Sequence, residues 1–340
     1  MDGKHKEPGP GSWIGAAVQG LVPVGVAAAV AIAIGAGVDV VHRHQKSGEK
    51  ERSARPAAEQ DRTAPRHVVA IREPGNALVV RDVRTGNDVG LAVASPAGQR
   101  FQRVAAAGDG TFVVAAAGAG KVTFQRLRLG EDGGPAELTP LPKAVVTGTS
   151  TAWSDLAVAP DGDRIAYVTY RPGGLGRLEV VSASTGERKT WTTTTPARVS
   201  SLSWAGSTLG FVWSPTRRVG GRIVHQVRTI DTASAPSGDL KTSKAVLKLP
   251  DGSGGAAVLG KDGRTVVAGV AKDAQLTVQS FAAGTGGPGG VLWRQKAAGQ
   301  AKSVTADHAG EHFLVLAGDG RLLIDGAAPL PAEDVLDAAW

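Results

Sequence analysis

Short apolar runs separated by Gly-rich turns fill the chain from residue 66 onwards. The clearest example is 156–168, where an apolar run, a Pro-Asp-Gly turn at 160–162 and a second apolar run follow one another. In such a turn Asp caps the backbone and Gly adopts a positive φ, so two antiparallel strands are joined tightly. A third run, such as 177–181, alternates apolar and polar residues, as one-sided burial requires. The pattern predicts strands throughout 66–340 and no amphipathic helix.

The strand pattern recurs in five full copies, which lie on average 50 residues apart. Propeller blades repeat roughly every 40–50 residues. The equivalent positions in the first strands of the copies are Val104, Leu156, Leu202, Ala257 and Val304. The repeat therefore predicts an all-β propeller.

The two ends of the repeat region complement each other. No first strand precedes the run at 67–71, while the last residues, 335–340, match the first strand at 199–204. We expect the C-terminal segment to supply the missing strand, because a ring closed in this way leaves no open sheet edge. Five full copies and one composite blade give six blades, or seven if the region 217–254 contains irregular strands.

The segment 159–167 has the Pro-Asp-Gly turn followed by an Ile-Ala strand. In this it resembles the repeat of the TolB-like and WD40-like bacterial propellers. The full motif occurs once, its other copies are degenerate, and the Trp-Asp dipeptide of the eukaryotic WD40 class is absent. The resemblance implies a binding platform, although the propeller fold carries both enzymes and scaffolds.

A different pattern marks the N-terminus, where 26 residues from 13 to 38 contain no charged side chain. A helix of this length reaches about 39 Å, which exceeds the hydrocarbon thickness of a bilayer. We predict one transmembrane helix (a signal-anchor) over 13–38, after a short polar N-terminus at 1–12 and before a charged linker at 39–65. A cleaved signal peptide is the alternative, with Lys4 and Lys6 as its basic start.

The orientation of this predicted span is balanced between two arguments. More Lys and Arg residues follow the span than precede it, which favours a cytoplasmic propeller. A short basic start before a long domain, together with the resemblance to exported bacterial proteins, favours export. We expect a single-pass protein of the cell membrane with its propeller outside the cytoplasm.

Composition excludes several classes of function. The chain has no Cys, so disulfides, thiolate metal sites and Cys nucleophiles are absent. The net charge is +7, but no Lys/Arg block with interleaved aromatic residues occurs. We therefore expect no nucleic-acid partner.

No local motif assigns a catalytic, cofactor-binding or metal-binding residue. His308 and His312 are four residues apart, yet the repeat places them in a turn and at the start of a strand, where turn chemistry is the simpler interpretation. The Gly-rich segment before Lys121 lacks the first Gly and the Ser/Thr of a phosphate-binding loop. We predict no cofactor.

Two groups of residues are candidates for binding. Trp191 lies in a Thr-rich run and is expected on an exposed outer strand, and Arg217 and Arg218 lie in a long loop, so these three are candidate partner contacts. Asp155, Asp307 and Asp337 lie on or beside first strands, so they are candidates for lining the central channel.

The sequence thus predicts a membrane-anchored, non-catalytic binding or scaffold protein of the bacterial cell envelope, with a protein or envelope component as partner. One alternative is a propeller hydrolase or lactonase with a metal in the central channel. Another is a regulatory propeller that faces the cytoplasm.

Overall fold

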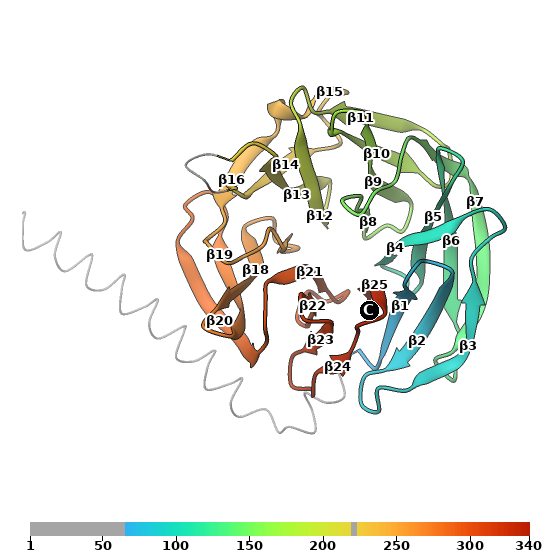
Figure 1. Cartoon of the computed structure of the whole chain (residues 1–340). Helices are drawn as coiled ribbons and strands as arrows, with labels where there is room; N and C mark the ends of the chain where they lie inside the picture. The colour runs from blue at the N-terminus through green and yellow to red at the C-terminus, as the bar shows by residue number, and fades with distance from the viewer. Residues whose placement is uncertain (1–64, 219–222) are drawn as a thin grey trace, which may run out of the picture. The chain divides into compact units, whose positions relative to one another are not determined.

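The computed structural model of the chain describes residues 65–218 and 223–340. Within these residues the strands form six sheets, arranged as blades around a central axis (Figure 1). The predicted six-bladed, all-β propeller is confirmed. The span expected over 13–38 lies outside the described residues, and no helix within them is long and apolar enough to cross a membrane.

Each blade begins with a strand at the central axis and continues outwards. Blade 1 consists of β25 (Val335–Ala339), β1 (His67–Arg72), β2 (Ala77–Asp82) and β3 (Asp88–Ala94). Blade 2 consists of β4 (Arg100–Ala106), β5 (Phe112–Gly118), β6 (Lys121–Leu129) and β7 (Pro135–Thr147). Blade 3 consists of β8 (Leu156–Val158), β9 (Arg164–Arg171), β10 (Leu175–Ser182), β11 (Arg188–Thr192) and the short β15 (Gly238–Asp239).

The other three blades have four strands each. Blade 4 consists of β12 (Ala197–Ala205), β13 (Thr208–Pro215), β14 (Gln226–Asp231) and β16 (Lys244–Lys248), with the 3-10 helix η1 (Leu240–Thr242) before β16. Blade 5 consists of β17 (Ala257–Leu259), β18 (Thr265–Lys272), β19 (Gln275–Ala282) and β20 (Pro288–Lys296). Blade 6 consists of β21 (Ala301–Ala306), β22 (Phe313–Ala317), β23 (Arg321–Ile324) and β24 (Leu330–Pro331).

The seven-bladed alternative is wrong. In the described part of 217–254, β14 and β16 are the outer strands of blade 4, and β15 joins blade 3. These strands complete two existing sheets and form none of their own. The length of the region comes from the connection that carries β15 from one blade to its neighbour.

The C-terminal strand β25 is the innermost strand of blade 1 (Figure 1). It pairs antiparallel with β1, with Val69 opposite Ala339 and Ile71 opposite Asp337. The first and last described strands of the chain therefore share one sheet. The closing strand gives blade 1 the innermost strand that the other five blades also have.

The hydrophobic core lies between neighbouring blades, because each blade packs against another on both faces. Leu178 of β10 belongs to a cluster with Trp204 of blade 4, while Val181 of the same strand belongs to a cluster with Phe124 of blade 2. The prediction that this strand is buried on one side only is therefore wrong, because both of its faces pack in the core. Even Glu179 is 1% exposed, and its Oε1 lies 3.1 Å from Nε of Arg177.

Trp191 on β11 is buried, so the expectation of an exposed side chain is wrong. The connection between β14 and β16 folds over β11, where Gly238 pairs with Trp191 in parallel. The indole Nε1 of Trp191 donates to the carbonyl oxygen of Pro236 at 2.8 Å. A segment some 45 residues further along the chain thus covers this side chain. The sequence around Trp191 contains no pattern that predicts this contact.

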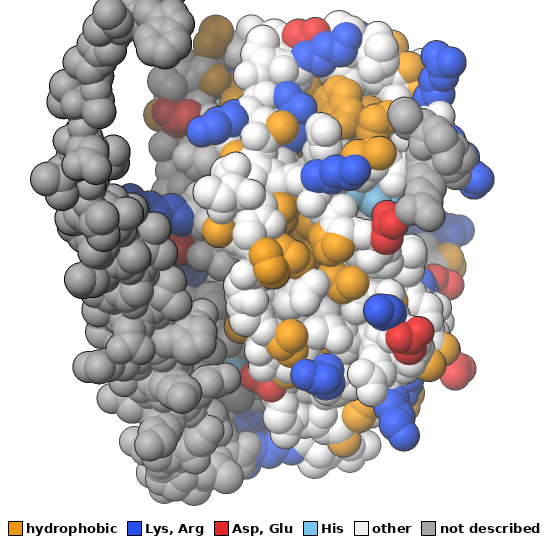
Figure 2. All heavy atoms as spheres, turned by 90° about the vertical axis from the view of Figure 1, so that its left-hand side faces the viewer, with side chains coloured by type: hydrophobic (Ala, Val, Ile, Leu, Met, Phe, Trp, Pro, Cys, Tyr) orange, Lys and Arg blue, Asp and Glu red, His pale blue; other side chains and the backbone are white. Residues whose placement is uncertain are grey.

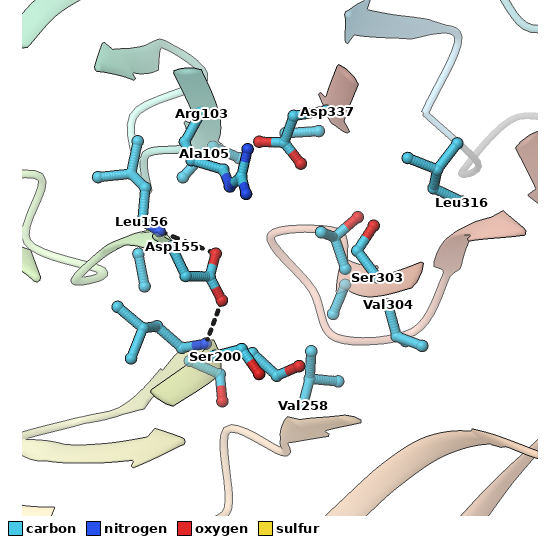
Figure 3. Close-up of a pocket in the computed structure, with 18 of the residues that line it drawn as sticks. Arg103, Ala105, Asp155, Leu156, Ser200, Val258, Ser303, Val304, Leu316 and Asp337 are labelled. Atoms are coloured by element: carbon cyan, nitrogen blue, oxygen red, sulfur yellow. Dashed lines mark hydrogen bonds between the residues drawn. The ribbon is translucent and has the colours of Figure 1, made fainter. Parts of the chain in front are cut away.

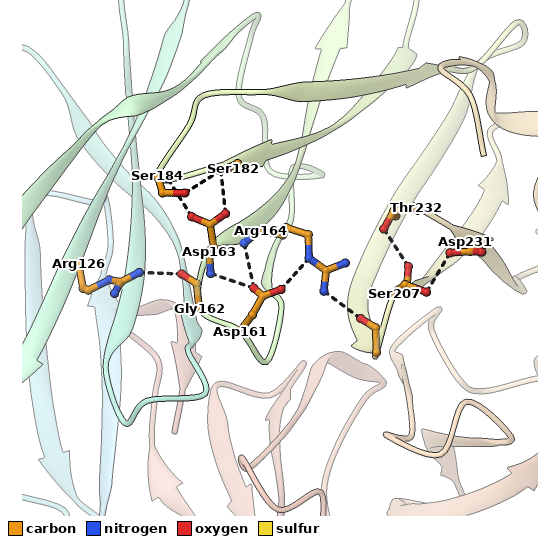
Figure 4. Close-up of polar contacts among 11 residues, drawn as sticks. Arg126, Asp161, Gly162, Asp163, Arg164, Ser182, Ser184, Ser207, Asp231 and Thr232 are labelled. Atoms are coloured by element: carbon orange, nitrogen blue, oxygen red, sulfur yellow. Dashed lines mark hydrogen bonds and ion pairs between the residues drawn. The ribbon is translucent and has the colours of Figure 1, made fainter. Parts of the chain in front are cut away.

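The Asp-Gly turns between first and second strands connect neighbouring blades (Figure 4). Asp161 Oδ1 accepts hydrogen bonds from the backbone N–H groups of Asp163 and Arg164, as expected of a capped turn. Arg126 of blade 2 donates to the carbonyl oxygen of Gly162 in blade 3, and Arg164 of blade 3 donates to that of Gly206 in blade 4. Arginines therefore link successive turns on this end of the propeller.

The outer surface offers isolated apolar side chains. Val291 on β20 is 48% exposed. On the side of the molecule shown in Figure 2, hydrophobic side chains form small separate patches between scattered Lys and Arg.

Candidate functional site

The innermost strands of the six blades surround a cavity of about 890 Å³ on the central axis (Figure 3). Small-molecule sites in proteins typically occupy roughly 300–1,000 Å³. Main-chain and side-chain atoms of all six innermost strands form the wall. The cavity is therefore the candidate functional site.

Asp155 and Asp337 both lie in the cavity wall, and each binds the next blade. Asp337 Oδ2 of blade 1 accepts a hydrogen bond from the backbone N–H of Val104 in blade 2 at 2.9 Å. Asp155 Oδ2 of blade 3 accepts one from the backbone N–H of Leu202 in blade 4 at 3.0 Å. Val104 and Leu202 occupy equivalent positions of the repeat. The two carboxylates thus perform the same task in different blades.

Two other first-strand side chains make corresponding contacts. Arg103 of blade 2 donates from Nε to the carbonyl oxygen of Ser154 and from Nη2 to that of Ala152, both at 2.6 Å. Ser201 Oγ of blade 4 donates to the carbonyl oxygen of Gly255 before blade 5 at 3.0 Å. Side chains at these positions therefore join blades 1 to 5 in sequence around the cavity.

Burial raises the pKa of Asp337 to about 7. The positive charge of Arg103 and the hydrogen bond from Val104 act against this rise, while the negative charge of Asp155 adds to it. The pKa of Asp155 is raised as well, again mainly by burial and again opposed by Arg103. Two carboxyl groups and one guanidinium thus share a poorly solvated space, and the charge of Asp337 changes near neutral pH.

Trp153, in the loop before β8, contributes an aromatic surface to the cavity wall. Trp153 is 44% exposed, and its indole ring packs edge-on against Tyr170, with ring centroids 5.9 Å apart. The Tyr170 hydroxyl donates to the Trp153 carbonyl oxygen at 3.3 Å, and Thr151 Oγ1 accepts from the Trp153 N–H at 3.1 Å. Together with the two Arg103 bonds to Ala152 and Ser154, these contacts hold the loop in one conformation.

Asp307 lies in the cavity wall, where it stabilises the turn after β21. Its Oδ1 accepts from the backbone N–H groups of Glu311 and His312 at 2.8 and 3.1 Å. His312 packs edge-on against Trp340 at 6.4 Å. Over the described ranges 65–218 and 223–340, no group of three or more His, Cys, Asp or Glu side chains is arranged to hold a metal ion.

The remaining sequence candidates lie away from the cavity. Arg217 and Arg218 follow β13 and are exposed, and neither lines the cavity wall. Trp191 is a buried residue of β11, the strand that pairs with β15. The structure therefore brings Asp155, Asp307 and Asp337 to one site and leaves the three candidate partner contacts elsewhere.

Sequence reasoning missed Trp153, Arg103 and Arg198 as residues of the site. Trp153 lies before β8, Arg103 lies within β4 and Arg198 lies at the start of β12. Their position relative to Leu156, Val104 and Leu202 was the available signal. Because the innermost strand of each blade lines the cavity, residues in or just before a first strand are candidates for the wall.

Taken together, fold and site define a six-bladed β-propeller with a polar central cavity. No family model matches the chain, and no curated protein matches it. Among solved structures, the chain is similar to TolB from Acinetobacter baumannii, with 16% sequence identity and a TM-score of 0.52 over 81% of this chain. The match covers 65% of that TolB chain, so the protein corresponds to about two thirds of its length.

Two further solved propellers show weaker likeness. One is a TolB candidate from Agrobacterium tumefaciens, with 14% identity and a TM-score of 0.43 over 80% of this chain and 88% of that chain. The other is a 6-phosphogluconolactonase candidate from Bacteroides uniformis, with 10% identity and a TM-score of 0.41 over 80% of this chain and 98% of that chain. At these identities the similarity concerns the fold alone.

Proposed function

We propose that the chain is a non-catalytic binding module of the bacterial cell envelope. The observation that carries this proposal is the use of the charged cavity side chains. Asp155, Asp337 and Arg103 are each bound to backbone groups of the next blade, while the firmly held Trp153 remains exposed. Because these charged side chains are engaged in hydrogen bonds between blades and an aromatic side chain is exposed beside them, the cavity suits ligand recognition better than catalysis.

The likeness to TolB supports this proposal at the level of the fold. TolB-like propellers mostly act as binding platforms, and the cavity of this chain has the size of a ligand site. Fold similarity does not decide function by itself. The chemistry of the cavity is therefore the stronger part of the argument.

The proposal includes attachment to the membrane through residues 13–38, with the propeller outside the cytoplasm. The support is the uncharged run of 26 residues in the sequence. Protease treatment of intact cells and of lysed cells tests this directly. Cleavage of the propeller in intact cells is the expected result. Protection until lysis establishes the cytoplasm-facing alternative, and recovery of the propeller in the soluble fraction rules out the anchor.

One observation favours a channel hydrolase as second candidate. A carboxyl group with a pKa of about 7 inside a cavity is a suitable acid or base for catalysis. The metal content of the purified full chain and its hydrolysis of simple lactones separate the two functions. We expect no stoichiometric zinc or calcium and no hydrolysis above background. A bound metal together with lactone hydrolysis that Asp337→Asn abolishes would overturn the non-catalytic proposal.

A further inference from the structure

The central cavity is narrow at the end formed by the Asp-Gly turns. A Cβ atom at Gly108 of blade 2 would lie 2.1 Å from the carbonyl oxygen of Pro160 in blade 3 and 3.3 Å from Cε1 of His308 in blade 6. Turns of three blades thus meet at this end. A ligand has better access from the opposite end, where the first strands begin. The shape favours a small ligand over a polypeptide that passes along the whole channel.

Arg198 supplies positive charge at the entrance end of the cavity. It lies at the start of β12, is half-buried and lines the cavity. Its Nε atom is buried and has no hydrogen-bond partner in the protein, and none of the ion pairs within the described residues includes Arg198. Arg103, by contrast, donates to three carbonyl oxygens. Arg198 is therefore a cationic side chain available to an anionic group of a ligand, alongside Lys261 and Lys302, which also line the cavity.

Trp153 supplies a flat apolar surface near the same end. Tyr170 connects it to Arg198, because its hydroxyl group bonds the carbonyl oxygens of both Trp153 and Val199, the residue that follows Arg198. Trp153 as a whole residue is nearly half exposed, although several hydrogen bonds hold its loop. An indole face of this kind packs against the C–H face of a saturated ring or against another aromatic ring.

Deeper in the cavity the wall is rich in short polar side chains. Ser200, Ser303, Asp155 and Asp337 surround the space shown in Figure 3. Ser200 is 6% exposed and its Oγ atom is buried without a hydrogen-bond partner in the protein, whereas Ser303 is partly exposed in the cavity wall. Hydroxyl groups of a ligand match such a wall, because they donate to carboxylates and both donate to and accept from serine.

From this combination we propose that the cavity binds a small acidic sugar. The pyranose ring packs against Trp153, the carboxylate pairs with Arg198, and the ring hydroxyls bond the serine and aspartate side chains. This inference rests on the proposed binding function and gives it a class of ligand. A carboxylate without hydroxyls leaves the inner wall unmatched, and a neutral sugar leaves Arg198 unpaired.

Binding of D-glucuronate to the full chain in detergent micelles tests the inference. Saturation-transfer NMR and calorimetry measure the affinity, with D-glucose and cyclohexanecarboxylate as comparison ligands. We expect D-glucuronate to bind at least about tenfold more tightly than either, since each lacks one class of contact worth about 1.4 kcal/mol. Equal binding of the three compounds, or no binding of D-glucuronate, overturns the proposal.

Variants locate the binding within the cavity. Trp153→Ala and Arg198→Gln are each expected to weaken D-glucuronate binding about tenfold. Arg294→Gln, an exposed site on β20, is the matched control and is expected to leave affinity unchanged. Thermal unfolding of each variant confirms that it is folded. Affinity that is insensitive to both cavity variants contradicts the assigned site.

A peptide arm separates this inference from the proposed function. A hexapeptide rich in Glu is titrated into the same protein samples. If the peptide binds through Trp153 and Arg198 while D-glucuronate does not, the sugar is the wrong ligand but the binding module stands. The proposed function itself is tested separately, by the assays of bound metal and of lactone hydrolysis.

Discussion

The guanidinium group of Arg81 donates through Nη1 to the carbonyl oxygen of Pro331 at 2.7 Å, across 250 residues of sequence. Arg81 is on β2 of blade 1 and Pro331 is on β24 of blade 6. The same side chain bonds Asp334, in the connection that leads to the closing strand β25, at 3.2 Å. Arg81 therefore joins the first and last blades beside the point where the ring closes.

Replacement of this arginine tests the contribution of the contact to stability. Arg81→Met keeps the aliphatic stem but removes every donor. We expect the free energy of unfolding to fall by about 2 kcal/mol, the range for a partly buried hydrogen bond from a charged group. Urea unfolding followed by Trp fluorescence measures it. Arg294→Met on the exposed face of β20 is the control, and an equal effect of both substitutions contradicts a special role for Arg81.

Trp191 allows a test of the connection between blades 3 and 4. Trp191→Phe retains most of the buried ring but leaves the Pro236 carbonyl oxygen without its indole donor. We expect a loss of about 1–2 kcal/mol in unfolding free energy for Phe. For Trp191→Ala, which also creates a cavity, we expect a loss of about 3–5 kcal/mol. Near-zero effects of both substitutions would show that the β15 segment does not depend on this side chain.

The pKa of Asp337, raised from 3.8 to about 7, predicts a pH-dependent stability. Between these two values the folded protein binds more protons than the unfolded chain. The stabilisation that comes from the raised pKa of Asp337 is fully present below about pH 4 and is lost as pH rises to about 7. The shift sets an upper limit of about 4 kcal/mol on this contribution.

Asp337→Asn isolates that contribution from those of other buried carboxyl groups. The unfolding free energy of the wild-type protein is expected to decrease more steeply from pH 5 to pH 8 than that of the variant. Asp132→Asn, at an exposed turn before β7, is the control and should retain the wild-type slope. Parallel curves for the wild-type protein and Asp337→Asn contradict the raised pKa.

Gly108 tests whether the turns of blades 2, 3 and 6 meet as described. A methyl group at this position would lie 2.1 Å from the Pro160 carbonyl oxygen, which is backbone and moves little. We expect Gly108→Ala to lower stability by about 1–3 kcal/mol through overpacking. Gly98→Ala provides the comparison, since it has no atom within 4 Å but a φ of 71°. A smaller loss for Gly108→Ala than for Gly98→Ala is the contrary outcome.

Much of the fold followed from repetition in the sequence. The equivalent positions Val104, Leu156 and Leu202 all lie in innermost strands, and the match of 335–340 to 199–204 corresponds to β25 in blade 1. The prediction succeeded because most blades repeat the same local pattern, a Gly-containing turn between two apolar strands. Those rules act over a few residues, so they are readable in the chain.

The candidate site followed from the sequence only in part. Asp155, Asp307 and Asp337 were predicted to line the channel because they lie on or beside first strands of the repeat. Trp191 was expected to be exposed and is buried, and the exposed Trp153 was not identified as a residue of the site. Whether a tryptophan is covered depends on which distant segment packs on it, and the segment that covers Trp191 comes from the connection between β14 and β16 of blade 4.

The sequence by itself determined the propeller, the place of the closing strand and the turns, because hydrophobic period and turn chemistry are local. The tertiary structure alone decided which groups the charged side chains inside the ring contact and how far their pKa values shift. It placed Arg103 between Asp155 and Asp337, bound each to a neighbouring blade, raised the pKa of Asp337 by burial and left Arg198 and Trp153 facing the cavity. These are properties of residues brought together across blades. Their energies depend on solvent exclusion, which no single segment of the chain encodes.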